Sequence, residues 1–437
     1  MNSPTANDSL DPVSRTDESE ALDRAVRRAL WRLLPLLTVA NVFNYLDRVN
    51  VSFAALTMNA ELGLSATQFG FGAGLFYAGY VLFQVPSNLG LYRLGARRWL
   101  AGIMVVWGLV ASAAAFAVGP VSFAVLRLLS GAAEAGLTPG IILYLSFWFP
   151  VQYRARLLAF YLAAIPFSSV VGGPICGLIL QIHKFLGLSG WRWMFIVEGL
   201  PACLLGFLTW KILVDRPADA KWLTPEERAA LEKMQDRKVH TAQRQNLFEV
   251  FTDSRVLVLT SIQFLHVAGS IGVGIWLPQI LKSHGISNLR ASVLSAVPSL
   301  FAVVAMILWA RHVDKHGRPV LHLSLTLFLG AAGLVLSVLS NSLTIALIGI
   351  TIAVVGINSV RGIFWTIPPQ FLAGAAAAGG IAFINGMGNT GGFAGPLAVG
   401  WLKDRTGSFP AGLLVLAGGL LLSSVIAASL GRLQRSA

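Results

Sequence analysis

The chain has 437 residues, of which 55% are hydrophobic and 12% are charged, and its mean hydropathy is +0.69. A soluble globular domain carries about 25% charged residues, so this composition excludes a protein whose whole surface faces water. The formal net charge is +13, but the basic residues lie between apolar stretches and not in one soluble domain, which argues against a nucleic-acid partner. Cys176 and Cys203 lie in apolar segments and predict no disulfide framework.

The sequence predicts twelve membrane-spanning helices, because crossing about 30 Å of hydrocarbon takes roughly 20 apolar residues. The predicted spans are residues 31–56, 69–91, 97–118, 121–148, 155–182, 193–214, 256–281, 290–311, 319–339, 342–368, 379–402 and 410–431. We therefore expect an all-α membrane protein. Its predicted parts are a disordered cytoplasmic tail (1–28), two six-helix halves (29–214 and 256–431), a cytoplasmic linker (215–255) and a second cytoplasmic tail (432–437).

The linker carries one helix signal. Thr224 is in the N-cap position, Pro225 is the first helical residue and Glu227 is the third, which together form a capping box. A short amphipathic surface helix with a structural role is expected here.

The placement of Lys and Arg predicts the orientation of the chain in the membrane. The side that holds both termini carries 24 of these residues and the opposite side carries 6. Both termini are therefore expected in the cytoplasm, and the protein in the inner membrane of a bacterium.

The two halves are repeats of each other. Gly95, after span 2, and Gly317, after span 8, are 222 residues apart, and Pro174 in span 5 and Pro396 in span 11 have the same separation. Two independent matches at one offset indicate an internal duplication. Duplicated six-helix units are a transporter architecture, with the substrate bound near the midplane between the halves.

Charged side chains within spans 1 and 4 mark the candidate site, since a charge in a membrane helix costs a few kcal/mol or more. In span 1, Asn41, Asn44, Tyr45, Arg48 and Ser52 share one face, and Asp47 lies beside it. In span 4, Arg127 and Glu134 are two turns apart, roughly 10 Å, so each is expected to face span 1 or the cavity. A purely structural Asp47–Arg48 pair, and a structural or gate role for Arg127, remain alternatives.

Other polar and aromatic residues in the spans are candidates for lining a substrate cavity. They are Tyr80, Gln263, Phe364, Trp365, Asn385 and Asn389. His266 and Glu198 are interpreted as structural polar residues. Arg361 is either an additional ligand for a dicarboxylate or a residue that extends towards the cytoplasm, and the second interpretation is slightly favoured.

Several motifs resemble those of the major facilitator superfamily. Its loop motif between spans 2 and 3 recurs here as Arg93, Gly95, Arg97 and Arg98, with Tyr92 and Asn88 in place of the usual Asp and Gly, and more completely after span 8 as Asp314, Lys315, Gly317 and Arg318. Within the superfamily, residues 44–48, Arg127 with Glu134, residues 148–150 and residues 190–193 resemble the anion–cation symporter family. That family includes bacterial carriers of sugar acids, tartrate, phthalate and related organic anions.

The resemblance implies roles for these residues. Arg48 would bind the carboxylate of the substrate, Tyr45 and Tyr80 would donate hydroxyl groups, and Asp47 and Glu134 would accept protons under the control of Arg127. The loop motifs would form a cytoplasmic gate. The Gly-Pro pairs in spans 5 and 11 are interpreted as packing and kink sites, not as evidence for antiport.

The sequence thus predicts a monomeric, non-enzymatic carrier that imports a small organic anion with protons, by rocker-switch alternating access. No nucleotide-binding loop, metal cluster or catalytic triad is visible, so no cofactor or metal is expected beyond the coupling proton. An exporter or exchanger of the same fold is an alternative, and a transporter-like anion sensor is a more distant one.

Overall fold

The computed structural model describes residues 12–150, 153, 157, 161, 164–236, 252–372 and 374–433. The first half contains α1 (Pro12–Glu61), α2 (Ala66–Leu94), α3 (Ala96–Ala113), α4 (Pro120–Glu134), α5 (Leu137–Trp148), α7 (Ala164–Ile179) and α8 (Gly190–Ile212), and the linker contains α9 (Pro225–Asp236). The second half contains α11 (Ser254–Lys282), α12 (Asn288–His316), α13 (Pro319–Val338), α14 (Leu343–Phe364), α15 (Gly374–Asn389), α16 (Gly391–Thr406) and α17 (Pro410–Leu433).

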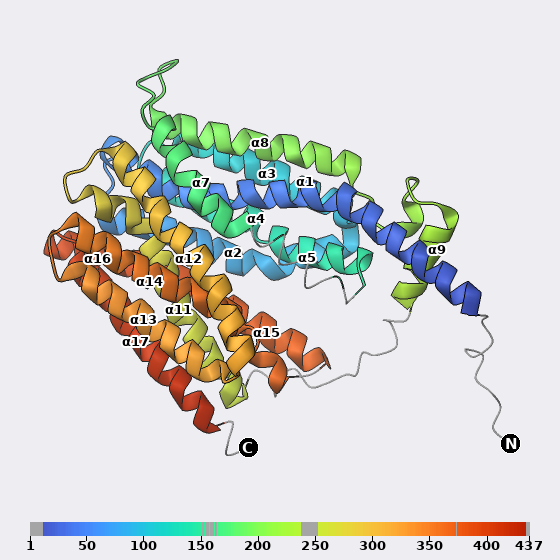
Figure 1. Cartoon of the computed structure of the whole chain (residues 1–437). Helices are drawn as coiled ribbons and strands as arrows, with labels where there is room; N and C mark the ends of the chain where they lie inside the picture. The colour runs from blue at the N-terminus through green and yellow to red at the C-terminus, as the bar shows by residue number, and fades with distance from the viewer. Residues whose placement is uncertain are drawn as a thin grey trace.

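The described chain is an all-α membrane protein. Nine segments within the described residues are long and apolar enough to cross a bilayer. The helices α2 and α7 and the α15–α16 pair occupy the positions of the three remaining predicted spans. The helices of the two halves form two bundles, drawn in blue to green and in yellow to red (Figure 1).

Two of the predicted spans are broken into two helices. Span 4 is split because α4 ends at Glu134 and α5 begins at Leu137, and span 11 is split at Thr390, between α15 and α16. Close packing accompanies the first break, since a Cβ at Gly136 would lie 1.9 Å from the Oγ of Ser87. Glu134 is therefore the last residue of α4, although α4 and α5 together still form one segment long and apolar enough to cross a bilayer.

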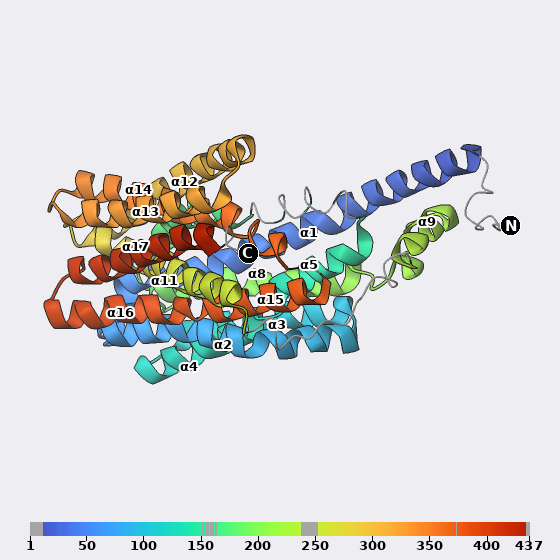
Figure 2. The same ribbon diagram turned by 90° about the horizontal axis from the view of Figure 1, so that it is seen from below.

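The two halves are in contact at one end of the molecule, which we call the closed end; it contains the turns at residues 62–65, 283–287 and 407–409. Helix α16 lies alongside α2 (Figure 2). A Cβ at Gly70 would lie 2.4 Å from the carbonyl oxygen of Pro396, and one at Gly173 would lie 2.4 Å from that of Ser292. Only glycine permits such close approach of two helix backbones.

Polar groups also join the halves at the closed end. Both carboxylate oxygens of Asp404 accept from the backbone at the start of α2, at 2.9 Å from the Ala66 nitrogen and 2.7 Å from the Thr67 nitrogen. The Nζ of Lys282 donates to the carbonyl oxygen of Leu56 at 2.8 Å. From these contacts the two bundles diverge towards the end that carries both chain termini, which we call the termini end (Figure 1).

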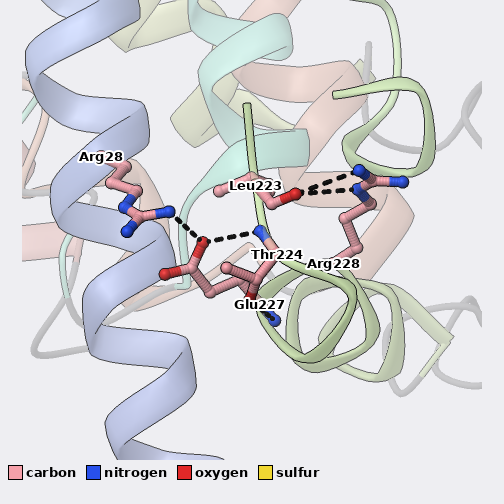
Figure 3. Close-up of polar contacts among 5 residues, drawn as sticks. All are labelled: Arg28, Leu223, Thr224, Glu227 and Arg228. Carbon is pink, nitrogen blue, oxygen red and sulfur yellow. Dashed lines mark hydrogen bonds and ion pairs between the residues drawn. The ribbon is translucent and has the colours of Figure 1, made fainter. Parts of the chain in front are cut away.

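Helix α9 of the linker docks against α1 at the termini end. The Nη1 of Arg28 and the backbone nitrogen of Thr224 both donate to the Oε2 of Glu227 at 3.0 Å (Figure 3). The backbone nitrogen of Glu227 donates in return to the Thr224 hydroxyl at 3.3 Å. The predicted capping box and the start of α9 at Pro225 are confirmed.

The same docking changes the interpretation of the N-terminal tail. Residues 12–28 were predicted to be disordered, but they continue α1 as helix. Ala25 and Ala29 are fully buried, and Arg28 is paired with Glu227. The tail sequence is polar, so the apolar pattern alone could not reveal that α9 supplies a packing surface for it. Residues 1–11 lie outside the described part of the chain.

Candidate functional site

A carboxylate of α4 and two polar side chains of α1 form the centre of the first half. The Oε2 of Glu134 accepts from the Nδ2 of Asn44 at 2.6 Å and from the Nε of Arg48 at 2.9 Å. Glu134 is fully buried, and the side chain of Arg48 is 13% exposed. The polar face predicted for span 1 thus faces α4, and Glu134 contacts α1.

Aromatic rings surround the guanidinium of Arg48. Its Cζ lies 5.1 Å from the ring centroid of Tyr45, 5.3 Å from that of Phe76 and 4.9 Å from that of Tyr80. The Cζ of Arg127 lies 4.7 Å from the ring of Phe76, so this phenylalanine lies within cation–π distance of both arginines. We did not predict Phe76 from the sequence. Its position one helical turn before Tyr80 was the signal that could have identified it.

Asp47 and Arg48 are adjacent in sequence but have different partners. The Oδ2 of Asp47 accepts from the Nε1 of Trp107 at 3.1 Å, and its Oδ1 accepts from the Nδ2 of Asn50 at 3.2 Å. Residues one apart on a helix point about 100° away from each other, which accounts for the separation. Arg127 is within electrostatic range of both Asp47 and Glu134. Trp107 on α3 is a second partner that the sequence pattern did not indicate.

Several polar atoms of this centre have unused hydrogen-bonding capacity, although Arg48 lies beside Tyr80 and Glu134 lies beside Asp47. The Nη2 of Arg48, the Nε of Arg127 and the Oε1 of Glu134 are buried and have no hydrogen-bond partner among the described residues. Buried polar atoms without partners are costly and rare, and they concentrate at functional sites. The centre therefore offers both donors and an acceptor to an additional group.

Glu198 of α8 is a third buried carboxylate of the first half. Its Oε1 accepts from the Sγ of Cys176 at 3.4 Å, and Asn50 lies beside it. It has no arginine partner among the described ion pairs. This geometry fits the structural role inferred for it from the sequence.

The candidates of the second half are placed less closely together. Gln263 is buried, and its side chain packs against Gly388 of α15. Phe364 is buried in the hydrophobic core, with its ring edge-on to that of Trp365 at 5.0 Å. Asn385 and Asn389 are half-buried, and neither side chain makes a hydrogen bond within the described residues.

The loop-motif residues have local roles in the structure. Gly95 has φ of +83°, and the backbone nitrogen of Arg97 donates to the Oδ1 of Asp215 at 2.8 Å, which ties the start of α3 to the segment after α8. In the second copy, Gly317 and Arg318 have φ of +66° and +58°. Neither turn makes a hydrogen bond or ion pair to the opposite half within the described residues. The motif residues not discussed individually are Arg93, Arg98 and Lys315, which lie at the same turns, and Asp314, whose side chain is outside the described part.

A helical membrane protein built from two related halves, with buried charges near the boundary between them, belongs structurally to the class of secondary transporters. Residues 37–396 match the family model of the Major Facilitator Superfamily, and the chain belongs to this family. It is a transporter and not an enzyme.

The chain is also similar to individual transporters and to solved transporter structures. The chain is 46% identical to a candidate tartrate transporter of Agrobacterium vitis, over 95% of this chain and 93% of that protein. It is 38% identical to a quinolone resistance transporter of Acinetobacter baumannii, over 93% of this chain and 96% of that protein. A solved bacterial homologue of the human lysosomal transporter Spinster, in an inward-facing and occupied conformation, has the same fold, with a TM-score of 0.75, 16% identity and coverage of 92% of this chain and 96% of that one.

Proposed function

We propose that this protein imports an organic carboxylate into a bacterial cell by proton symport. The observation that carries the proposal is the shared oxygen of Glu134, which accepts from Arg48 and Asn44 while the Nη2 of Arg48 has no described partner. A proton on Glu134 removes the counter-charge of Arg48, and a substrate carboxylate can replace it. The forked guanidinium suits both oxygens of a carboxylate.

Proton and anion binding would then reinforce each other, as coupled transport requires. The aromatic rings around Arg48 hold the guanidinium in place whether or not Glu134 is charged, because cation–π contacts do not depend on that carboxylate. Asp47, held by Trp107 and Asn50, is the second proton acceptor in the proposal. Arg127 adjusts the charge balance of both carboxylates.

The orientation completes the proposal. The excess of Lys and Arg on the side of the termini favours a cytoplasmic termini end and a closed end that faces the periplasm. In that orientation the halves touch on the periplasmic side and diverge on the cytoplasmic side, as expected of an inward-facing state (Figure 1). The transport cycle would open the α2–α16 and α7–α12 contacts and close the termini end, with the protein acting as a monomer and with no cofactor other than the proton.

The test is uptake of radiolabelled L-tartrate into proteoliposomes with an inward proton gradient. Arg48→Ala should abolish uptake, while Arg24→Ala, at an exposed arginine of α1 that pairs with Glu20, should leave it unchanged. Both proteins should unfold at the same temperature as the parent to within a few degrees. Undiminished uptake by Arg48→Ala would contradict its role as the anion receptor.

Export or exchange is the second candidate, because the Acinetobacter baumannii relative is named for quinolone resistance. The same liposomes separate the two candidates. Symport moves the substrate away from the acidified side, so acidification of the outside should speed uptake. Proton-driven export moves the substrate towards the acidified side, so the same acidification of the outside should drive preloaded substrate out. Efflux of the antibiotic norfloxacin without any tartrate flux would favour the second candidate.

A further inference from the structure

Arg361 of α14 is a charged residue of the second half that the proposed mechanism does not use. Its Nη2 donates to the Oγ of Ser270 on α11 at 3.2 Å. It also lies within electrostatic range of His266 on α11 and of Tyr77 on α2, in the opposite half. The side chain therefore points towards α11, and does not extend to the membrane surface as the favoured sequence interpretation held.

Tyr77 connects this arginine to the first centre. Arg48 and Arg127 lie within its electrostatic range from the first half, and Arg361 does so from the second. The ring of Tyr77 also sits against Gly392 of α16, where a Cβ would lie 2.5 Å from it. Guanidinium groups from both halves therefore act electrostatically on one tyrosine.

The charges around Tyr77 do not balance. Arg48 is paired with Glu134, and Arg127 faces Asp47 and Glu134, but Arg361 has no carboxylate partner among the described residues. Three cations therefore face two anions, and when both carboxylates carry protons the excess is three positive charges. An uncompensated guanidinium within a membrane span is costly. A ligand with a single carboxylate would leave this excess larger than a ligand with two.

His266 adds a specific acceptor beside Arg361. Its Nε2 lies 2.9 Å from the carbonyl oxygen of Ile357, and because a carbonyl only accepts, this nitrogen carries the proton. The Nδ1 is then an acceptor. It is buried and has no partner among the described residues, and the whole residue is 2% exposed. A buried acceptor of this kind is matched by the hydroxyl group of a ligand.

We propose that Arg361, with Ser270 and His266, forms a second carboxylate subsite opposite Arg48, so that the transported substrate is a hydroxylated dicarboxylate. One carboxylate binds Arg48 and the other binds Arg361, while a hydroxyl between them donates to the Nδ1 of His266. The inference rests on the proposed function, since it assigns a substrate class to the same site.

The experiment measures dissociation constants of matched acids on the purified protein by isothermal titration calorimetry at acidic pH. The pairs are L-tartrate with D-glycerate, and galactarate with galactonate; in each pair only the first acid has a second carboxylate. The parent protein should prefer the diacid in at least one pair. A charge-assisted contact accounts for roughly a 10- to 100-fold difference in affinity.

Arg361→Gln should weaken diacid binding by that factor and leave monoacid binding unchanged, so that the preference disappears. Arg361→Lys should restore part of it. His266→Phe should reduce the preference for L-tartrate over succinate, which lacks hydroxyl groups. The control is Arg311→Gln, at an exposed arginine near the C-terminal end of α12. It should change none of these dissociation constants.

Two failures are distinguishable. If Arg48→Gln does not weaken any acid, the proposed function is wrong. A different result would contradict the second subsite alone. In that case Arg48→Gln lowers the affinity for all acids, whereas Arg361→Gln either lowers the affinities for diacids and monoacids equally or changes neither. Binding of no diacid by the parent, or preference for the monoacid in both pairs, would also overturn the inference.

Discussion

The two halves use equivalent positions of their fourth helices in opposite ways. At the repeat offset of 222 residues, Arg127 and Glu134 correspond to Gly349 and Gly356. A Cβ at Gly349 would lie 2.4 Å from the backbone nitrogen of Ser337, and one at Gly356 would lie 2.5 Å from that of Gly330. The first half thus has charged side chains at these positions, and the second half has glycines that allow close contact between α13 and α14.

The difference shows how a duplicated fold becomes asymmetric. Buried charges need donors, acceptors and space around them, whereas glycines allow two helices to touch along their backbones. One half therefore holds a polar centre at these positions, and the other joins two of its own helices there by close backbone packing. Arg361 is the exception in the second half, since its repeat counterpart is Pro139.

The largest effect is expected from a substitution of Glu134, the charged residue of the first half that corresponds to Gly356 in the second. In Glu134→Gln the amide keeps an acceptor for Asn44 but can neither bind a proton nor pair with the charge of Arg48. Stimulation of tartrate uptake by a proton gradient, a coupling normally worth about 5- to 150-fold, should therefore vanish. Exchange of labelled for unlabelled tartrate should persist, because Arg48 stays available. Proteoliposome uptake and counterflow assays measure the two activities.

Glu198→Gln is the matched control for this experiment. Glu198 is also a buried carboxylate of the first half, but it contacts Cys176 and no arginine. Its substitution should leave the gradient stimulation intact. Equal loss of coupling in both variants would mean that burial of any carboxylate matters and that the arginine contact does not.

A smaller effect is expected at the packed positions of the second half. Gly356→Ala inserts a methyl group where the backbone of α13 lies within contact distance, and overpacking of this kind costs about 1–3 kcal/mol. Gly362→Ala, in the same helix, meets nothing within 4 Å and should be neutral or stabilising, because alanine favours a helix by about 1 kcal/mol over glycine. Thermal unfolding in detergent compares them. A Gly356→Ala protein as stable as the Gly362→Ala protein would refute the packing role.

The smallest effect is expected at Asp404, which joins the halves at the closed end, two residues beyond the predicted end of span 11. Partial burial opposes its ionisation, but hydrogen bonds from Thr67, Ser65 and Ala66 hold the pKa of Asp404 below its usual value. The contact is therefore fully formed above the usual pKa of an aspartate and is lost as the pH falls through the lowered one.

Asp404→Asn removes the charge at the start of α2, a contribution of about 0.3–1 kcal/mol. Amide hydrogen exchange at Ala66 and Thr67 should become about two- to fivefold faster, as measured by mass spectrometry. Exchange at the start of α12, capped by Ser287 of its own half, should not change. Arg405→Gln is a control at the adjacent position, and unchanged exchange in Asp404→Asn would remove Asp404 from the contact between halves.

Much of the fold could be predicted from the sequence. The twelve apolar runs and the capping box of α9 rest on local patterns that tertiary packing does not override. The break after Glu134 was not predicted, because the length of residues 121–148 favours a single span. Gly136 and Pro139 were the local signals for it, and the packing of Gly136 on Ser87 accompanies the break. The helical tail over residues 12–28 was missed because its partner lies about 200 residues away.

The site divides in the same way. Helical spacing placed Asn44 and Arg48 on one face and directed Glu134 towards it, since periodicity specifies which residues share a face. The partners across the bundle could not be derived in this way. Trp107 and Phe76 belong to helices whose rotation is set by three-dimensional packing, and an aromatic residue in an apolar span resembles any core residue. The direction of Arg361 depended on the same information.

The docking of α9 on α1 has a mechanical consequence for the two halves. Arg28 and Glu227 attach α9 to α1, which belongs to the first half. Helix α9 therefore moves with the first half when the halves change their relative position. Within the described residues the halves themselves meet at the closed end and where Tyr77 packs on Gly392.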